Sequence, residues 1–280
     1  MNIGVSLPSH SLGDLPKAVD AIVTLDREGF DFVTTSGHVL TAEAGRYPER
    51  PAPTYATTYR DPFVLFAAAA VLTSRIRFRT SILILPMLPT ALIAKQAAEL
   101  SILSGGRFDL GVGISWQHAE YAALGQHLAG RGERLAEQVE VLRRLWTERF
   151  VTFKGDYHEI DRLGVGEPPA RPVPIWFGCS AAEAPLRRAS QMADGWIPLT
   201  PPRPEEVARL REYAMSAGRD PSALGIQGRA TLGTDIIEQA SAQLAAGATD
   251  LSLSVPPASD PDALLEQLHT ARQSLRQAGI

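Results

Sequence analysis

A histidine stands directly after a short apolar segment near the start of the chain. Residues 30–34 predict a β-strand, and Ser36, Gly37 and His38 follow it. An imidazole can give or take a proton near neutral pH, so His38 is the best candidate for acid–base catalysis. The alternative is an exposed loop histidine that only forms hydrogen bonds.

A second polar segment, Gly178-Cys179-Ser180, follows the apolar residues 175–177. If a helix opens here, backbone N–H groups and the Ser180 hydroxyl could bind a phosphate, because the N-terminus of a helix attracts anions. The alternative is a serine that caps the helix without a ligand. Cys179 has no histidine near it in the sequence, which favours an inert, packed thiol over a nucleophile.

A glycine-bearing loop follows a third apolar segment. Residues 108–112 predict a buried strand, and Gly113 allows a ligand to come close to the backbone at its end. Ser115, Trp116 and Gln117 come next. The tryptophan could flank a flat ring system or simply fill the top of the fold.

Several common catalytic motifs are missing. The segment Gly111 to Trp116 matches only the first half of a dinucleotide-binding fingerprint, because it ends in tryptophan where glycine is needed. The sequence has no Gly-Lys-Ser/Thr phosphate loop and no Gly-x-Ser-x-Gly elbow. Its six histidines, at 10, 38, 118, 127, 158 and 269, lack metal-ligand spacing, so no metal site is expected.

The composition limits the possible partners. With 280 residues, 45% of them hydrophobic, the chain suits either two small domains or one α/β barrel of about 250 residues. A net charge of -4 gives no basic field that would attract nucleic acid or a membrane surface. The single cysteine, Cys179, excludes an internal disulfide and fits a reducing cytoplasm. We expect no signal peptide or membrane span, because no window approaches 18 uncharged apolar residues.

Predicted strands and helices alternate eight times along the chain. Each connection contains a helix long enough for a right-handed crossover between parallel strands. We therefore predict one (β/α)8 TIM barrel over residues 1–280, with its chemistry at the C-terminal ends of the strands. The expected strands are 3–7, 30–34, 76–85, 108–112, 175–177, 195–199, 224–232 and 251–255.

Two segments interrupt this alternation. Residues 39–60 form a long loop after the second strand, without a clear period, and are expected to form a lid. Residues 151–160 predict a small hairpin inserted outside the barrel repeat. Among individual residues, Asp61 and Thr90 are expected to cap helices, and Trp146 is expected in the core because it shares one helical face with other apolar residues.

The sequence also contains short motifs with a distinctive order and spacing. They are Ile84-Leu85-Pro86, Ala94-Lys95-Gln96, Gly105 to Trp116, Arg131-Gly132-Glu133-Arg134, Leu145-Trp146-Thr147-Glu148, Val151 to Gly155, Phe177-Gly178-Cys179-Ser180 and Ala193-Asp194-Gly195-Trp196. Together they resemble the bacterial luciferase-like superfamily over most of residues 1–200, and the resemblance is weak beyond that. It implies a flavin- or deazaflavin-dependent oxidoreductase on a (β/α)8 barrel.

The resemblance implies roles for residues at the strand ends. Luciferase-like enzymes often place an acid–base residue at the position of His38. Ser81-Ile82 matches the place where relatives carry a bulge with a non-prolyl cis peptide that supports the cofactor ring, and an ordinary strand interior is the alternative. The cofactor phosphate is expected near Ser180. The predicted catalytic residue is His38, and the predicted cofactor-binding residues are Ser81, Ile82, Gly113, Ser115, Trp116, Gln117, Gly178, Cys179 and Ser180.

Coenzyme F-420 is the preferred cofactor and FMN is the alternative. Flavin-using relatives often carry a basic residue at the fourth strand exit, whereas residues 113–117 contain none, and Ile82 resembles the aliphatic ring support of deazaflavin enzymes. F-420 implies hydride transfer with a small organic substrate, and FMN implies a monooxygenase. The alternatives from other classes are a barrel that binds flavin without turnover and a lyase acting on a phosphorylated metabolite. His118 and Glu120 are expected to be structural, and a homodimer is expected from the resemblance.

Overall fold

Eight parallel strands close into a ring in the computed structural model, which describes residues 1–7, 14–41, 43, 59–233, 235–255 and 261–280. The strand order is β1-β10-β9-β8-β7-β4-β3-β2, and the ring closes where Ile3 of β1 pairs with Leu251 of β10. The predicted TIM barrel is therefore confirmed. The strands are β1 (Asn2–Ser6), β2 (Phe32–Gly37), β3 (Arg77–Ile84), β4 (Phe108–Gly113), β7 (Ile175–Cys179), β8 (Gly195–Pro198), β9 (Gly225–Thr231) and β10 (Asp250–Ser254).

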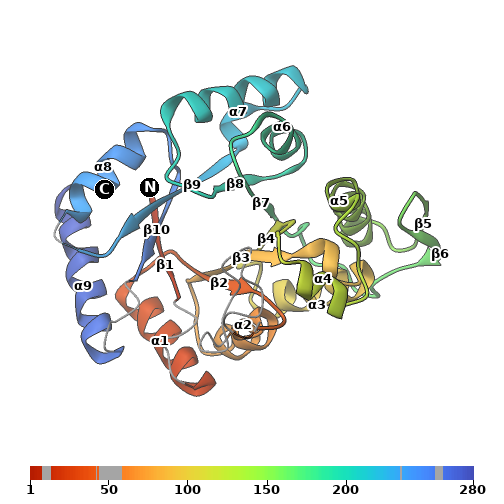
Figure 1. Ribbon diagram of the computed structural model, residues 1–280. Helices are drawn as coiled ribbons and strands as arrows, with labels where there is room; N and C mark the ends of the chain where they lie inside the picture. Colours follow the sequence, from red (N-terminus) through yellow and green to blue (C-terminus); the bar gives the residue numbers. More distant parts are fainter. Residues whose placement is uncertain (8–13, 42, 44–58, 234, 256–260) are drawn as a thin grey trace.

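Helices surround this ring on the outside (Figure 1). The predicted order of strands and helices is confirmed, although the second strand starts two residues later than expected and continues through Gly37. The α-helices are α1 (Leu15–Glu28), α2 (Pro62–Ala70), α3 (Thr90–Leu103), α4 (His118–Ala123), α5 (Arg131–Thr147), α6 (Glu183–Met192), α7 (Pro204–Ser216), α8 (Ile236–Ala245) and α9 (Pro261–Gln277), and the 3-10 turns are Leu85–Met87 and Pro221–Ala223.

The helix ends agree only in part with the expected caps. Asp61 caps α2 as predicted, because its carboxylate accepts a hydrogen bond from the Val64 backbone N–H at 2.9 Å. The prediction for Thr90 is wrong, since Pro89 is the N-cap of α3 and Thr90 is already helical. The Thr90 hydroxyl instead accepts a hydrogen bond from the Gln138 side-chain amide, at 2.9 Å, which ties α3 to α5. Trp146 is buried, as predicted.

The predicted hairpin is present outside the barrel. It consists of β5 (Val151–Lys154) and β6 (Glu159–Leu163), which pair antiparallel and project beyond α5 (Figure 1). Glu137 of α5 holds the turn: its carboxylate lies 2.7 Å from Nδ1 of His158 and accepts the backbone N–H groups of Asp156 and Tyr157, each at 2.8 Å. The expected lid falls mostly on residues 42 and 44–58, which lie outside the described part of the chain.

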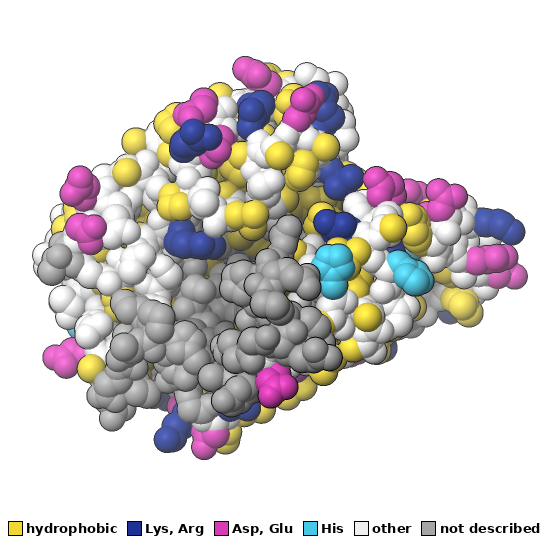
Figure 2. All heavy atoms as spheres, viewed as in Figure 1, with side chains coloured by type: hydrophobic (Ala, Val, Ile, Leu, Met, Phe, Trp, Pro, Cys, Tyr) yellow, Lys and Arg dark blue, Asp and Glu magenta, His cyan; other side chains and the backbone are white. Residues whose placement is uncertain are grey.

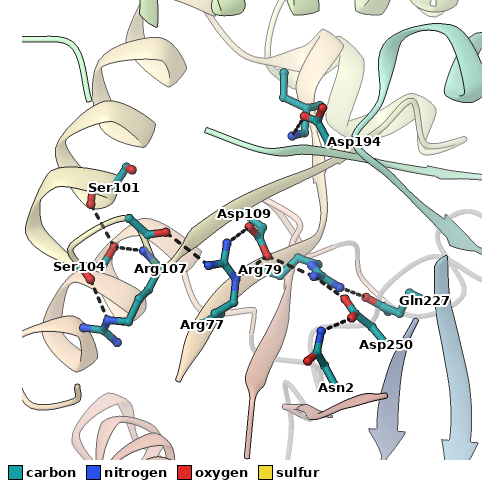
Figure 3. A network of polar contacts seen from close by, with 12 residues as sticks. Asn2, Arg77, Arg79, Ser101, Ser104, Arg107, Asp109, Asp194, Gln227 and Asp250 are labelled. Atoms are coloured by element: carbon teal, nitrogen blue, oxygen red, sulfur yellow. Dashed lines mark hydrogen bonds and ion pairs between the residues drawn. The ribbon is translucent and has the colours of Figure 1, made fainter. Parts of the chain in front are cut away.

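Charged side chains cross the barrel interior near the N-terminal ends of the strands (Figure 3). The guanidinium of Arg79 on β3, 2% exposed, lies between the rings of Phe32 and Trp176, 4.7 and 3.5 Å from their centroids. It donates to carboxylates on β4 and β10, Asp109 at 3.1 Å and Asp250 at 2.7 Å. One side chain thereby links strands on opposite sides of the ring.

This ionic cluster continues to both sides of Arg79. Asp250 also accepts a hydrogen bond from the Asn2 side chain at 2.7 Å, and Asp109 also pairs with Arg77. Gln227 of β9 accepts from the second Arg79 amino group at 3.0 Å. Because every charge in the cluster has an opposite charge or a hydrogen-bond partner, burial of these groups is tolerated.

The surface gives no sign of a strongly charged interface on the face seen in Figure 2. Among the coloured side chains, basic and acidic groups are interspersed there, and most lie toward the outer edge of the molecule. Within the part of the chain that the structure describes, no helix is both long and apolar enough to cross a membrane.

Candidate functional site

A cavity of about 370 Å³ opens at the C-terminal ends of β2, β3, β4, β7 and β8. This is the end of a TIM barrel at which substrates bind. The ring of strands brings most of the predicted site residues together around it, although they are up to 142 residues apart in the sequence. The predicted residues that line it are His38, Ser81, Ile82, Ser115, Trp116, Gly178, Cys179 and Ser180.

A larger cavity, of about 560 Å³, lies at the opposite end and includes the ionic cluster around Arg79. We assign the functional site to the smaller cavity for two reasons. The charged groups of the cluster already bind one another, and the N-terminal end of such a barrel serves stability rather than catalysis.

The floor of the smaller cavity is the side chain of Ile82. The Ser81–Ile82 peptide bond is cis, and the pairing of β3 with β4 shifts register between Arg79 and Leu83. Glycines flank the side chain: a Cβ on Gly178 would lie 2.4 Å from Cγ2 of Ile82, and one on Gly113 would lie 2.8 Å from its Cδ1. Both positions therefore have to be glycine for the isoleucine to occupy this place.

The sequence suggested no partner for His38, but the structure shows one. Its Nδ1 lies 2.6 Å from Oε2 of Glu120, and the Glu120 side chain is 2% exposed. No described residue contacts the other ring nitrogen, Nε2, with a hydrogen bond, and the imidazole lines the cavity. The pair brings the end of β2 against α4. Glu120, which the sequence led us to expect as a structural residue without a contact to His38, is therefore part of the candidate site.

Tyr59 lies beside this pair. Its ring centroid is 4.8 Å from that of the His38 imidazole. Burial, together with the negative charge of Glu120, raises the pKa of the Tyr59 hydroxyl above its ordinary value. The phenol is therefore neutral at physiological pH and adds an apolar wall to the imidazole.

Two predicted residues do not line the cavity. Gly113 lies beneath Ile82, where it makes room for that side chain. Gln117 is 3% exposed, and its backbone N–H donates to the Ser115 hydroxyl at 3.3 Å. A cofactor contact for Gln117 stays a prediction.

The last residue of β7, Cys179, is a packed cysteine, as expected. Burial raises the pKa of the Cys179 thiol to about 12, so the thiol is neutral and a poor nucleophile at physiological pH. The Cys179 carbonyl accepts a hydrogen bond from the Trp196 indole N–H at 3.1 Å. Trp196 is buried, whereas Trp116 faces the cavity.

The expectation that Ser180 opens a helix is wrong. Helix α6 begins at Glu183, and its N-cap is Ala182, which has no side-chain hydrogen bond. Glu183 places a carboxylate in the first turn, where it opposes binding of a phosphate at this helix end.

A positive charge on α6 lies near Cys179, at the exit of β7, instead. Arg188, half-buried on α6, forms no hydrogen bond or ion pair with any described residue. Its amino groups lie 2.9 and 3.0 Å from the place a Cβ of Gly132 would occupy, so the guanidinium lies against the first turn of α5. Its charge also lowers the pKa of Cys179, against the larger effect of burial. The cation is thus near the exit of β7, and no described carboxylate pairs with it.

Metal ligands do not gather in the described residues, where no group of three or more His, Cys, Asp and Glu side chains could hold an ion. The polar groups that line the cavity are instead the His38 imidazole and several serine hydroxyls, and the Arg188 guanidinium lies near the exit of β7. They suit an organic ligand with a flat apolar part and an anionic part.

About half of the chain aligns with a protein of Mycobacterium tuberculosis. Uncharacterized protein Rv0940c of Mycobacterium tuberculosis is 42% identical over 137 residues, which are 49% of this chain and 47% of that protein. The alignment thus spans about half the length of this relative.

Solved structures extend the likeness to the whole fold. An F-420-dependent secondary alcohol dehydrogenase, in complex with an F-420–acetone adduct, superposes with a TM-score of 0.81 over 98% of both chains, at 18% identity. Monooxygenase RslO1 from Streptomyces bottropensis gives a TM-score of 0.72 at 22% identity, over 98% of this chain and 97% of that one. The sequence profile described as luciferase-like monooxygenase matches residues 1–279. The chain therefore belongs to the luciferase-like monooxygenase family, and it shares its fold with an F-420-dependent dehydrogenase and with a monooxygenase.

Proposed function

We propose that the protein is an oxidoreductase that transfers a hydride between a small organic substrate and coenzyme F-420, with His38 as the proton partner. The observation that carries the proposal is the shared cavity of His38 and Ile82, in which a proton-transfer group faces an aliphatic floor. The F-420 cofactor supplies the hydride acceptor or donor, and the protein supplies binding, orientation and proton transfer.

The chain offers complementary groups for such a cofactor. Ile82, held between two glycines, gives an apolar surface for a flat ring. Ser180 and the unpaired Arg188 give polar contacts for a phosphate. His38, whose Nε2 forms no hydrogen bond with a described residue, can exchange the proton that accompanies hydride transfer at a substrate oxygen.

The main competing function is a flavin-dependent monooxygenase, which the family profile favours by its description. The aliphatic floor and the absence of a basic residue in 113–117 favour F-420. Titration of the protein with F-420 and with FMN, under anaerobic conditions and followed by absorbance and fluorescence, tests the choice. We expect F-420 to bind more tightly than FMN, and to be reduced when a small organic substrate that can donate a hydride is added. Tight binding of FMN alone would contradict the proposal.

The phosphate contact can be tested separately from the ring contact. We expect Arg188→Gln to weaken FMN and F-420 binding at least tenfold, because a hydrogen bond to a charged group contributes about 1.5–3 kcal/mol. Riboflavin, which has no phosphate, should bind equally to both forms of the protein. Arg187→Gln is the matched control, since Arg187 is exposed and pairs with Glu183. Equal losses with riboflavin and FMN would contradict a phosphate role for Arg188.

The homodimer stays a prediction. The apolar residues Val64, Val71 and Leu72 are exposed on and just after α2, and Leu92 and Leu103 are exposed on the adjoining α3. We propose that a second copy of the chain covers this surface.

A further inference from the structure

A single buried carboxylate holds three consecutive residues that follow β2. Besides His38, Glu120 binds the backbone N–H groups of Val39 at 2.9 Å and Leu40 at 3.0 Å, both through Oε1. Glu120 belongs to α4, which follows β4, and β3 lies between β2 and β4 in the ring. The side chain therefore connects the exits of two strands that are not neighbours.

The charge of Glu120 determines which ring nitrogen of His38 carries the proton. Burial acts to raise the pKa of this carboxyl, but hydrogen bonds from His38, Leu40 and Val39 and the charge of His38 outweigh it, so the pKa lies below its ordinary value. An ionised carboxylate only accepts hydrogen bonds. His38 must therefore donate from Nδ1, and in the neutral imidazole the lone pair is on Nε2.

We propose that Glu120 is a positioning residue, which fixes the tautomer of His38 and keeps its Nε2 available to a ligand in the cavity. The hydrogen bonds from the backbone N–H groups of Val39 and Leu40 to Glu120 also hold the main chain next to His38, and so help to keep the imidazole in place. The consequence for catalysis rests on the proposed function of His38, whereas the effect on the tautomer does not.

The chain contains a matched control far from this cavity. Glu137 binds Nδ1 of His158 at 2.7 Å and two consecutive backbone N–H groups, the same pattern that Glu120 makes. This second pair fastens the outer hairpin to α5 and does not line the cavity. The Glu137→Gln variant therefore shows the effect of losing a histidine–glutamate pair elsewhere in the protein, for comparison with the loss of the His38–Glu120 pair.

The direct test is nitrogen-15 NMR of histidine-labelled protein without cofactor, at a pH where the imidazoles are neutral. We expect the Nδ1–H tautomer for His38 in the wild type and a shift toward Nε2–H, the form that predominates in free imidazole side chains, in Glu120→Gln. Glu137→Gln should change the signals of His158 and leave those of His38 unchanged. An Nε2–H tautomer in the wild type, or an unaltered His38 in Glu120→Gln, would overturn the inference, and the wild-type result needs no variant to fold.

Kinetics then separate this inference from the proposed function. We expect Glu120→Gln to lower kcat about tenfold or more with little change in cofactor affinity, and Glu120→Asp, which keeps the charge, to restore part of the tautomer preference and of the rate. Glu137→Gln should keep the wild-type rate. A changed tautomer with an unchanged rate would support positioning by Glu120 but reject His38 as the proton partner.

Discussion

Replacement of His38 by alanine is expected to lower the rate of hydride transfer by about 10²- to 10⁴-fold, the usual contribution of a general acid or base. The cofactor affinity should change little, because the proposed contacts with the ring and phosphate come from Ile82, Ser180 and Arg188. Stopped-flow measurement of F-420 reduction, with the cofactor Kd determined on the same preparations, checks both parts.

The control for this variant is His118→Ala. His118 is exposed at the start of α4, the helix that carries Glu120, and does not line the cavity. Its loss should leave the rate unchanged. If His38→Ala kept the wild-type rate, His38 would have no part in the chemistry, and a water or substrate group would have to exchange the proton.

Replacement of Arg79 by methionine is expected to destabilise the fold by about 3–5 kcal/mol, the cost of removing one partner from a buried ionic group. Asp109 and Asp250 would each lose a hydrogen bond to a cation in a buried setting. Urea denaturation followed by circular dichroism measures the change in the free energy of unfolding. Arg187→Met, which removes an exposed i,i+4 pair, should give no resolvable change.

A double variant identifies the cause of the loss. In Arg79→Met with Asp250→Asn, one buried carboxylate no longer needs a cation, so part of the stability should return. Asn2 can still bond to the asparagine at this position. A double variant no more stable than Arg79→Met would show that the loss comes from packing between Phe32 and Trp176 rather than from uncompensated charge.

The barrel could be predicted from the sequence because its signals are local. Each strand is a short apolar run, and helix ends such as Asp61 carry their own capping chemistry. The prediction for Thr90 was wrong because a threonine before an apolar run resembles a helix cap. Its hydroxyl instead binds the side chain of Gln138, 48 positions away. The expectation that a helix opens at Ser180 was wrong for a similar reason: a serine after a strand resembles a cap, but the N-cap of α6 is Ala182.

The candidate site could be predicted only at the level of strand ends. The barrel rule selected His38, Ile82 and Ser180, because all strand C-termini meet at one end. Glu120 could not be paired with His38, as 82 residues separate them and no local pattern relates a helix residue to the exit of a strand two places away. Arg188 gives no signal in the sequence, because what distinguishes it is that none of the described residues pairs with its charge.

The fit of Ile82 between Gly113 and Gly178 has an evolutionary consequence. A methyl group added at either glycine would collide with the isoleucine. Positions 82, 113 and 178, which lie on three separate strands, therefore cannot be substituted independently of one another. A lineage that acquired alanine at position 178 would need a smaller side chain at position 82, whereas alanine at position 113 would also collide with the carbonyl oxygen of Gly178, 2.9 Å from the added carbon. These three residues would then be inherited as a unit, even where the surrounding loops diverge.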